Sequence, residues 1–288
     1  MKQFLASELV LTDKGAVYHL GITPEQLGDK IIIVGDQNRV EVISNRFDDV
    51  THKSQNREFA CHTGMFKGKN ITVLSTGIGT DNIDIVLNEL DALVNIDLNS
   101  RTTKDELTSL DIVRIGTCGI LQDEIPVDSF ILSSHALGID NVGHFYELKN
   151  SHETEELLKA IEAAIDLPKH VKPYLTPASS ELNERLDNPD IKKGITVTSS
   201  GFYGPQGRAL RLPLSAPKMN DSLHDFSFKN HRFSNLEMEC SALFALSTAL
   251  GHKATAICLG LANRRKKEFS KRYKERMDLL IDYVLERI

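Results

Sequence analysis

The chain has 288 residues, of which 41% are hydrophobic and 26% are charged, as in an ordinary soluble globular protein. A formal net charge of −6 argues against nucleic acid or an anionic membrane surface as the main partner. The sequence has no apolar run long enough for a membrane helix or a signal peptide, so we expect a cytoplasmic protein. It also lacks internal repeats and linkers rich in Gly, Ser or Pro. We therefore expect a single domain that spans residues 1–288.

Short β-branched runs alternate with helical patterns along the chain, which is typical of an α/β sheet. The runs predict strands at Lys30–Val34, Phe59–Phe66, Ile71–Ser75, Ile112–Ile115, Ser129–Ser133, Gly194–Thr198 and Ala254–Leu259. Apolar residues at helical spacing predict helices at Asp81–Asn95, Ser151–Ile165 and Cys240–Leu250, and a C-terminal helix with an apolar stripe from Phe269 to Leu285. The polar segment Asn95–Ser109 is expected to be a surface loop or a short helix capped by Thr103.

The cysteines and histidines do not follow the spacing of a metal site. Four cysteines lie far apart without a CxxC pair, and ten histidines show neither HxxxH nor HExxH spacing. The cysteines are Cys61, Cys118, Cys240 and Cys258. We expect free thiols and no catalytic metal.

An arginine interrupts one of the predicted strands. Arg114 lies within Ile112–Ile115, and the Gly-Thr-Cys-Gly sequence that follows is expected to form a turn. A guanidinium buried in an apolar strand costs several kcal/mol, roughly, unless an anion meets it. Nearby glycines would let backbone N–H groups approach that anion. A structural arginine paired with a buried carboxylate would explain the same residue, so the segment alone leaves both interpretations open.

Two other strands lead through glycines into helices. One continues into Gly35 and then Arg39, and the other into the glycine-containing segment from Thr76 to Thr80. In an open α/β sheet, ligands bind beyond the carboxyl ends of strands, where helix N-termini point. Arg39 alone could be a surface residue. Together with Arg114 it predicts a site for a dianion such as phosphate.

Two further segments carry groups suited to a planar base and a sugar. Phe202 offers an aromatic face, Gln206 offers donors and an acceptor, and Arg208 offers donors only. Such a set can recognise a ring with carbonyl oxygens and an N–H, as in a pyrimidine dione. Glu239, at the start of a predicted helix, lies where the helix N-terminus stabilises a carboxylate and could accept two hydrogen bonds from a vicinal diol. A polar turn and an ordinary helix-start acid would also explain these residues.

Taken in order, these segments resemble the nucleoside phosphorylase-I family, and within it the uridine phosphorylases. The shared motifs are His-Leu-Gly, Gly-Asp-x-x-Arg-Val, Arg-Glu-Phe, Ser-Thr-Gly-Ile-Gly, Arg-Ile-Gly-Thr, Phe-Tyr followed by Gln-x-Arg, and Glu-Met-Glu. The resemblance implies an α/β fold with a central mixed, barrel-like sheet flanked by helices. It also implies cleavage of uridine by phosphate to uracil and ribose 1-phosphate, without a cofactor, in homo-oligomers built from dimers with shared active sites.

The resemblance also implies roles for individual residues. Phosphate would be held by Gly35, Arg39, Arg114 and Thr117, and by Arg57 of the neighbouring subunit. Ribose would be held by Glu237, Met238 and Glu239, and by His19 of the neighbouring subunit. Uracil would be held by Phe202, Gln206 and Arg208. The groups implied to act in catalysis are Arg208, Gln206 and Glu239.

Three alternatives stay open from the sequence. Purine-cleaving relatives typically place an Asp after the last central strand, and Cys258–Arg264 offers no acid, which favours uracil. A hydrolytic nucleosidase would not need the phosphate arginines, and a non-catalytic nucleoside-binding protein could keep the fold. The chain departs from the family at Gln37-Asn38 and in the basic run Arg265–Lys267.

Overall fold

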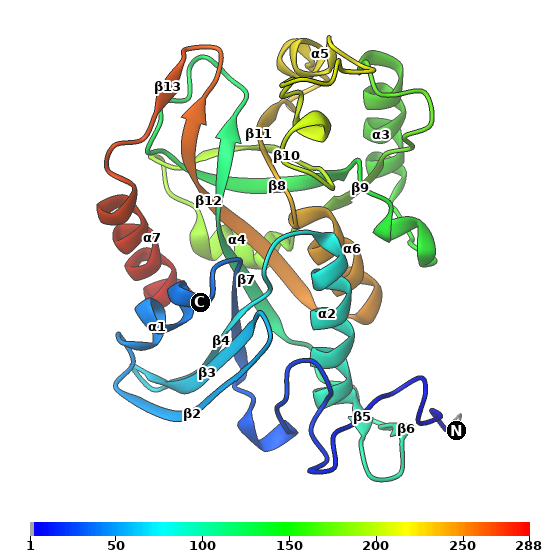
Figure 1. The fold of residues 1–288 in the computed structure, drawn as a ribbon, viewed down its shortest axis with the longest axis vertical. Coiled ribbons are helices and arrows are strands. Elements are labelled where there is room, and N and C mark those ends of the chain that lie inside the picture. The colour runs from blue at the N-terminus through cyan, green and yellow to red at the C-terminus, as the bar shows by residue number, and fades with distance from the viewer. Residues whose placement is uncertain (1–2) are drawn as a thin grey trace.

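Eleven strands form one mixed sheet in the computed structural model, which describes residues 3–288 (Figure 1). The strands are β1 (Lys30–Val34), β2 (Asp49–Asn56), β3 (Phe59–Phe66), β4 (Lys69–Ser75), β7 (Asp111–Ile120), β8 (Phe130–Gly138), β9 (Tyr174–Pro177), β10 (Lys192–Thr198), β11 (Phe233–Glu237), β12 (Lys253–Asn263) and β13 (Glu268–Phe269). A separate hairpin contains β5 (Ile96–Asp97) and β6 (Thr102–Thr103). The α-helices are α1 (Gln37–Ser44), α2 (Thr80–Asn95), α3 (His152–Ala164), α4 (Ser180–Leu186), α5 (Met219–Asp225), α6 (Cys240–Leu250) and α7 (Tyr273–Arg287).

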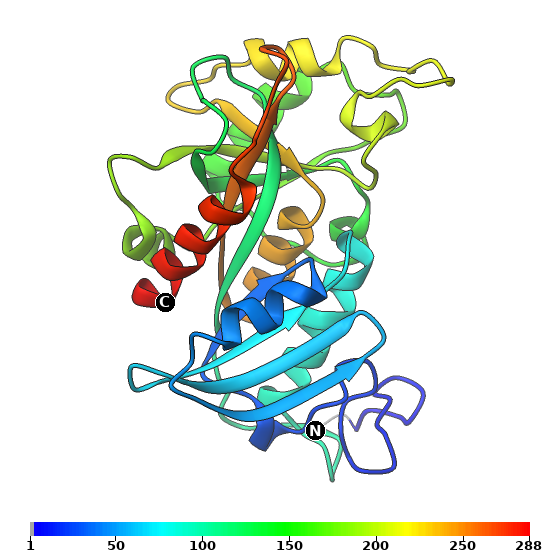
Figure 2. The ribbon, with the colours of Figure 1, turned by 60° about the vertical axis from the view of Figure 1, so that its left-hand side comes forward.

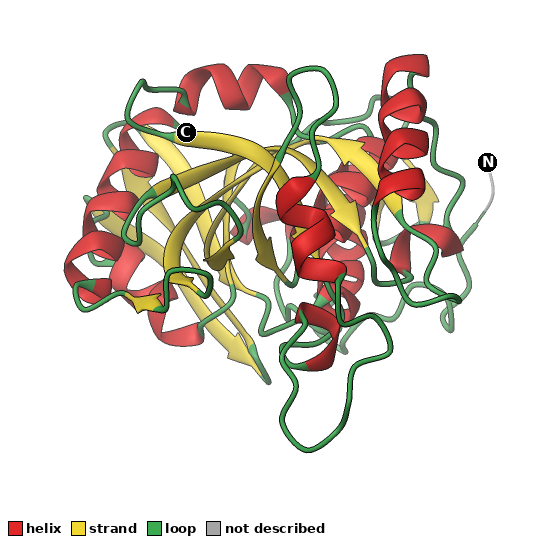
Figure 3. Ribbon diagram, turned by 90° about the horizontal axis from the view of Figure 1, so that it is seen from above, coloured by secondary structure: helices red, strands yellow, loops and turns green. Residues whose placement is uncertain are grey.

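Five of the strands close into a ring, because β7 pairs with the strands at both ends of the series. β7 is parallel to β12, and β12 is antiparallel to β8. β8 is parallel to β10, β10 is parallel to β11, and β11 returns antiparallel to β7. From β7 the sheet continues outward through β1, β4, β3 and β2. Seen from above, the helices lie around the strands (Figure 3). The expected mixed, barrel-like sheet flanked by helices is confirmed.

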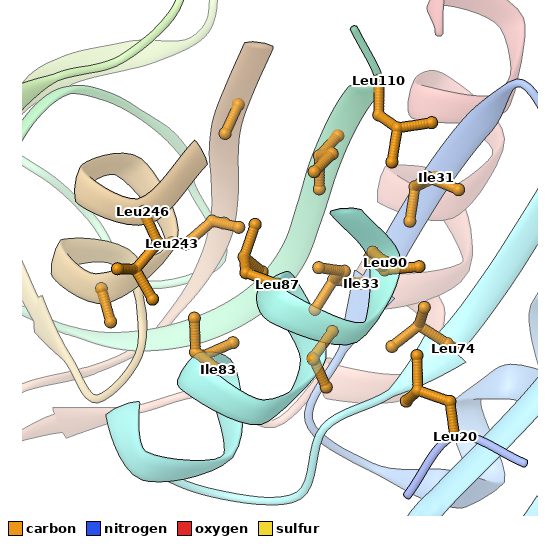
Figure 4. Packing of buried hydrophobic residues seen from close by; sticks show 14 of the residues in the cluster. Leu20, Ile31, Ile33, Leu74, Ile83, Leu87, Leu90, Leu110, Leu243 and Leu246 are labelled. Atoms are coloured by element: carbon orange, nitrogen blue, oxygen red, sulfur yellow. The ribbon is translucent and has the colours of Figure 1, made fainter. Parts of the chain in front are cut away.

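Strand β1 is buried on both faces, which explains its uninterrupted apolar sequence. On one face, Ile31 and Ile33 belong to a cluster that includes Leu87 of α2 and Leu243 of α6 (Figure 4). Burying one such side chain fully stabilises the fold by about 1.5–3 kcal/mol. This packing holds α2 and α6 against the sheet, and Ile78 and Glu239, which come just before these helices, line the cavity described below.

The other face of β1 packs against α1 and α7. Val40 of α1 and Ile281 of α7 are fully buried in this second cluster. The two helices lie close together in both side views (Figure 1 and Figure 2). Arg46 follows the end of α1, and an ion pair of 2.9 Å between its Nη2 and Oδ1 of Asp278 joins this segment to α7. The end of the chain is therefore fixed beside the first helix.

Several elements have the bounds that the sequence predicts, namely Lys30–Val34, Phe59–Phe66 and Cys240–Leu250. As expected, the four cysteines are free. Within the described residues, no helix combines the length and the apolar character needed to cross a membrane.

The expected turn after Ile115 is wrong. Residues 116–119 continue strand β7, because Gly116, Thr117 and Cys118 pair with successive residues of β12. A pattern of glycine and polar residues indicates a turn only when no neighbouring strand takes up its backbone hydrogen bonds.

Two smaller expectations also fail. Thr103 lies in the hairpin strand β6 and caps no helix, and Phe269 lies in β13 with 68% of its surface exposed, outside the buried stripe of α7. Strand β2 was not predicted, because it is a polar edge strand that lacks apolar alternation and is held by its pairing with β3.

Candidate active site

A cavity of about 750 Å³ opens where β7 and β11 meet the starts of α1 and α6. Its volume suits a small organic ligand. All predicted site residues except His19 and Arg57 line it: Gly35, Arg39, Arg114, Thr117, Phe202, Gln206, Arg208, Glu237, Met238 and Glu239. Strands and helices far apart in sequence therefore bring the three predicted groups of residues into one space.

Arg39 forms part of the cavity wall. It lies in the first turn of α1, where Asp36 caps the helix by accepting the N–H of Asn38 at 3.0 Å. Only 8% of Arg39 is exposed. Its Nη1 donates to the carbonyl oxygen of Ile115 at 3.1 Å, and its Nη2 donates to the hydroxyl of Tyr273 at 2.9 Å. Arg39 is therefore a fixed cation in the cavity wall and not a surface residue.

Arg114 lies deeper in the same cavity and is paired with carboxylates. Its Nη2 bonds to Oε2 of Glu239, and its Nη1 lies 3.5 Å from Oε2 of Glu237. Burial alone would lower the pKa of Arg114, but the two carboxylates outweigh it and raise that pKa well above its usual value. The structure therefore shows the second interpretation of the sequence, an arginine paired with buried carboxylates, and these carboxylates are the residues predicted to hold the sugar.

Gly116 is needed for the position of this guanidinium and not for a turn. A β-carbon at residue 116 would collide with Nη1 of Arg114 and lie 2.8 Å from its Cζ. The absent side chain lets Arg114 fold across the β7 backbone toward the carboxylates.

The two carboxylates have different partners. Glu237 ends β11 and accepts the N–H of Glu239 at 2.9 Å, the N–H of Cys240 at 3.0 Å and the hydroxyl of Thr198 at 2.5 Å. Burial raises the pKa of Glu237 to about 7, with Arg114 opposing the shift and Glu239 adding to it. Glu237, and not Glu239 as expected, is therefore the carboxylate that meets the N-terminus of α6.

Glu239 is turned toward the loop that precedes α2. Its Oε1 accepts the N–H of Gly79 at 2.8 Å, while Oε2 meets Arg114. The glycine loop expected to hold an anion does so here, but the anion is a carboxylate of the protein itself. Glu239 is consequently fixed between β7 and the loop before α2.

The predicted base-binding residues contact one another in the cavity wall. The guanidinium of Arg208 stacks 3.8 Å from the ring centre of Phe202. Its Nη1 donates at 2.5 Å both to the carbonyl oxygen of Phe202 and to Oε1 of Gln206. Burial, with a smaller effect from Arg264, lowers the pKa of Arg208 to about 10, so the group stays charged at neutral pH. An aromatic face, an amide and a cation therefore lie together.

Arg264 holds the loop that carries Gln206, and it was not predicted as a site residue. Its Nη2 donates to the carbonyl oxygen of Gln206 at 2.6 Å, and its Nη1 to that of Gly207 at 3.2 Å. Gly207 has a φ of +69°, a conformation that favours glycine. Arg264 is separated from this loop by more than 50 residues, so no local spacing in the sequence indicates the contact.

His19 and Arg57 lie outside the cavity, on a surface near one another. Nδ1 of His19 is 2.6 Å from Oε1 of Glu89, and Arg57 is exposed at the turn between β2 and β3 with a φ of +54°. Asn56, next to Arg57, donates to the carbonyl oxygen of His19 at 2.9 Å. Neither side chain lines the cavity of its own chain.

A sequence model of the phosphorylase superfamily matches residues 29–286. The chain belongs to this superfamily. It is 28% identical over 280 residues to a uridine phosphorylase of Thermococcus kodakarensis, covering 94% of this chain and 86% of that protein. It is also 28% identical over 240 residues to a DeoD-type purine nucleoside phosphorylase of Clostridium novyi, covering 83% and 84%.

Solved structures of the superfamily have the same fold. A nucleoside phosphorylase of Trypanosoma brucei, described as showing uridine phosphorylase activity, superposes with a TM-score of 0.90 at 29% identity and covers 97% of this chain and 98% of that one. A uridine phosphorylase of Phytophthora capsici superposes with a TM-score of 0.76 at 21% identity, covering 99% and 98%.

Proposed function

We propose that this protein catalyses the reversible phosphorolysis of uridine to uracil and ribose 1-phosphate, as a pentosyltransferase. The observation that carries the proposal is a connected series of groups in the cavity wall. Arg114 pairs with Glu237 and Glu239, and the main-chain carbonyl of Glu237 accepts a hydrogen bond from Gln206. Gln206 in turn accepts from Arg208, which stacks on Phe202. The series offers cations for inorganic phosphate, carboxylates for the ribose of a nucleoside, and an aromatic ring, an amide and a cation for its base. The relatives described as uridine phosphorylases support the same assignment.

We assign the binding of phosphate to Gly35, Arg39, Arg114 and Thr117. Two buried guanidinium groups in one wall suit a dianion, because each can donate two N–H groups to its oxygens. Glu239 and Glu237 face Arg114. We assign the binding of ribose to these two carboxylates and to Met238. A carboxylate there can accept hydrogen bonds from the sugar hydroxyls.

The proposed mechanism depends on the charges that develop on the sugar and on uracil as the base leaves. As the base leaves, the sugar acquires the cationic character that is common to glycoside cleavage. Bound phosphate stabilises this charge and attacks the same carbon, so no protein nucleophile is needed and positioning does most of the work. Arg208 and Gln206 would stabilise the negative charge that develops on uracil, which commonly contributes about 3–4 kcal/mol per donor.

We also propose that the active unit is a homo-oligomer built from dimers, as a cytoplasmic single-domain enzyme without a cofactor. His19 and Arg57 support this proposal, because both lie on the surface near Asn56 and outside the cavity of their own chain. A neighbouring subunit could use this surface to supply Arg57 to the phosphate and His19 to the ribose.

A purine nucleoside is the second candidate substrate, because a relative at 28% identity is described as a DeoD-type purine nucleoside phosphorylase. The end of β12 favours uridine over a purine. Its last residues, Ala262 and Asn263, offer no acid to protonate a purine ring, and Asn263 instead donates to the carbonyl oxygen of Gln122 at 2.9 Å.

An ultraviolet assay of uridine, thymidine, inosine and adenosine, each with and without inorganic phosphate, tests the proposal. We expect base release from uridine only when phosphate is present. Release of uracil without phosphate would identify a hydrolase, and preferential cleavage of inosine or adenosine would identify a purine enzyme. Nucleoside binding without any cleavage would identify a non-catalytic binding protein.

A further inference from the structure

Arg39 is held by neutral oxygens, whereas Arg114 is held by carboxylates. The two acceptors of Arg39 are the Ile115 carbonyl and the Tyr273 hydroxyl. Among residues 3–288, no carboxylate forms an ion pair with Arg39, while Arg114 faces both Glu237 and Glu239. Neutral acceptors orient a guanidinium without cancelling its charge, so Arg39 presents a full positive charge to the cavity.

The contacts of Arg39 also leave N–H groups for an anion. A guanidinium has five N–H donors, and each of the two acceptors takes one of them, on different terminal nitrogens. Because the acceptors come from β7 and from the start of α7, they fix the plane of the group from two directions. A fixed plane is what bidentate contact with a phosphate requires.

Tyr273, of which 38% is exposed, is placed by the anchored start of α7. The segment before it is anchored by the N–H of Ser270, which donates to the Leu261 carbonyl at 2.7 Å, and by the Ser270 hydroxyl, which donates to Asp128 at 2.5 Å. One turn into α7, Nε of Arg276 donates to the Asp128 carbonyl at 3.1 Å. Buried side chains farther along α7 pack the helix against the sheet.

We propose that Tyr273 is a positioning residue for phosphate, which acts by orienting Arg39 through its hydroxyl. The proposal rests on the proposed function, because it assumes that Arg39 binds phosphate. Tyr273 does not line the cavity, and its contribution is the direction in which Arg39 points.

The test compares Tyr273→Phe, Arg39→Ala and the double variant with the wild type, in steady-state kinetics and in calorimetric titration with inorganic phosphate. Tyr273→Phe keeps the ring and removes only the hydroxyl. Because one hydrogen bond to a charged group is lost, we expect the Kd and KM for phosphate to rise about fivefold to tenfold. The KM for uridine should stay unchanged, and the melting temperature without phosphate should fall no more than it does in Tyr283→Phe, which also loses one hydrogen bond. This comparison separates positioning from a structural role.

A matched control lies on the same helix. The hydroxyl of Tyr283 donates to the Leu186 carbonyl at 2.9 Å, away from the cavity, so Tyr283→Phe should leave phosphate binding unchanged. In the Arg39→Ala background, Tyr273→Phe should add nothing, because the group that it orients is gone.

The outcomes separate this proposal from the proposed function. If Arg39→Ala weakens phosphate binding but Tyr273→Phe stays within twofold of the wild type, Tyr273 has no positioning role. If Tyr273→Phe raises the Kd for phosphate by the same factor with and without Arg39, the positioning role is also wrong. If Arg39→Ala leaves the Kd for phosphate unchanged, both the role of Arg39 and this inference are wrong. Uracil release without phosphate overturns the proposed function on its own, since phosphate titration does not depend on turnover.

Discussion

Replacing Gly116 with alanine would place a methyl group where the Arg114 guanidinium crosses strand β7. The new β-carbon would collide with Nη1 of Arg114, lie 2.8 Å from its Cζ and lie 2.9 Å from Sγ of Cys258 on the adjacent strand. Because both neighbours are close, the guanidinium has to move away from Glu237 and Glu239.

The size of the effect follows from the two contacts that change. An extra methyl group in a packed interior costs about 1–3 kcal/mol, and complete loss of one partner of a buried ion pair costs about 3–5 kcal/mol. Arg114 is displaced but not removed, so we expect the free energy of unfolding to fall by about 2–4 kcal/mol. Activity should fall further: losing about 3 kcal/mol of contact with phosphate lowers kcat/KM about a hundredfold.

Gly260→Ala is the matched control. Its β-carbon would lie 2.7 Å from Cδ1 of Ile120, so it overpacks the same pair of strands without touching Arg114. Urea unfolding and phosphate-dependent kinetics of both variants form the assay. We expect both to lose stability and only Gly116→Ala to lose phosphate affinity. A folded Gly116→Ala protein with the wild-type KM for phosphate would refute the reasoning.

Three further predictions concern other parts of the molecule. Arg208→Ala should lower kcat by about 10²–10³ with little change in the KM for phosphate, because its charge is needed when uracil leaves; turnover within a few-fold of the wild type would exclude this role. Burial, with a smaller effect from His231, lowers the pKa of His135 to about 4, so between pH 6.5 and 4 the unfolded chain binds a proton that the folded chain does not. The free energy of unfolding should therefore fall as the pH is lowered through this window, and it should fall less in His135→Asn, as measured by urea midpoints. An equal dependence of the midpoint on pH in both proteins would contradict this role of His135. Finally, mixing inactive Arg57→Ala with inactive Arg114→Ala protein, after dissociation and reassociation, should restore part of the activity, since a mixed dimer has one site with both arginines; no recovery would argue against shared sites.

Arg114 illustrates how far the sequence leads at the site. A charged residue in an apolar strand predicts a buried anion, and the anion exists, but its identity depends on the ring of strands. β7 lies beside β11, so Arg114 meets the carboxylate at the end of β11. Two carboxylates more than 120 residues away could not be assigned to it from local pattern.

Although the buried strand β11 was not predicted, the chain order of residue types was sufficient to predict several strands and helices of the core, because apolar periodicity is a local property that burial requires. β1, β3 and α6 have the predicted bounds for this reason. The motifs likewise predicted which chemical groups would gather, since motif residues lie next to strand ends and helix starts.

Only the tertiary structure decided how those groups are oriented. Pairing with β12 turned the expected Gly116–Gly119 turn into a strand, and Tyr273 reached Arg39 across 234 positions of sequence. The physical reason is that strand pairing and side-chain hydrogen bonds join residues by proximity in space. Their energy depends on partners that no local stretch of sequence contains.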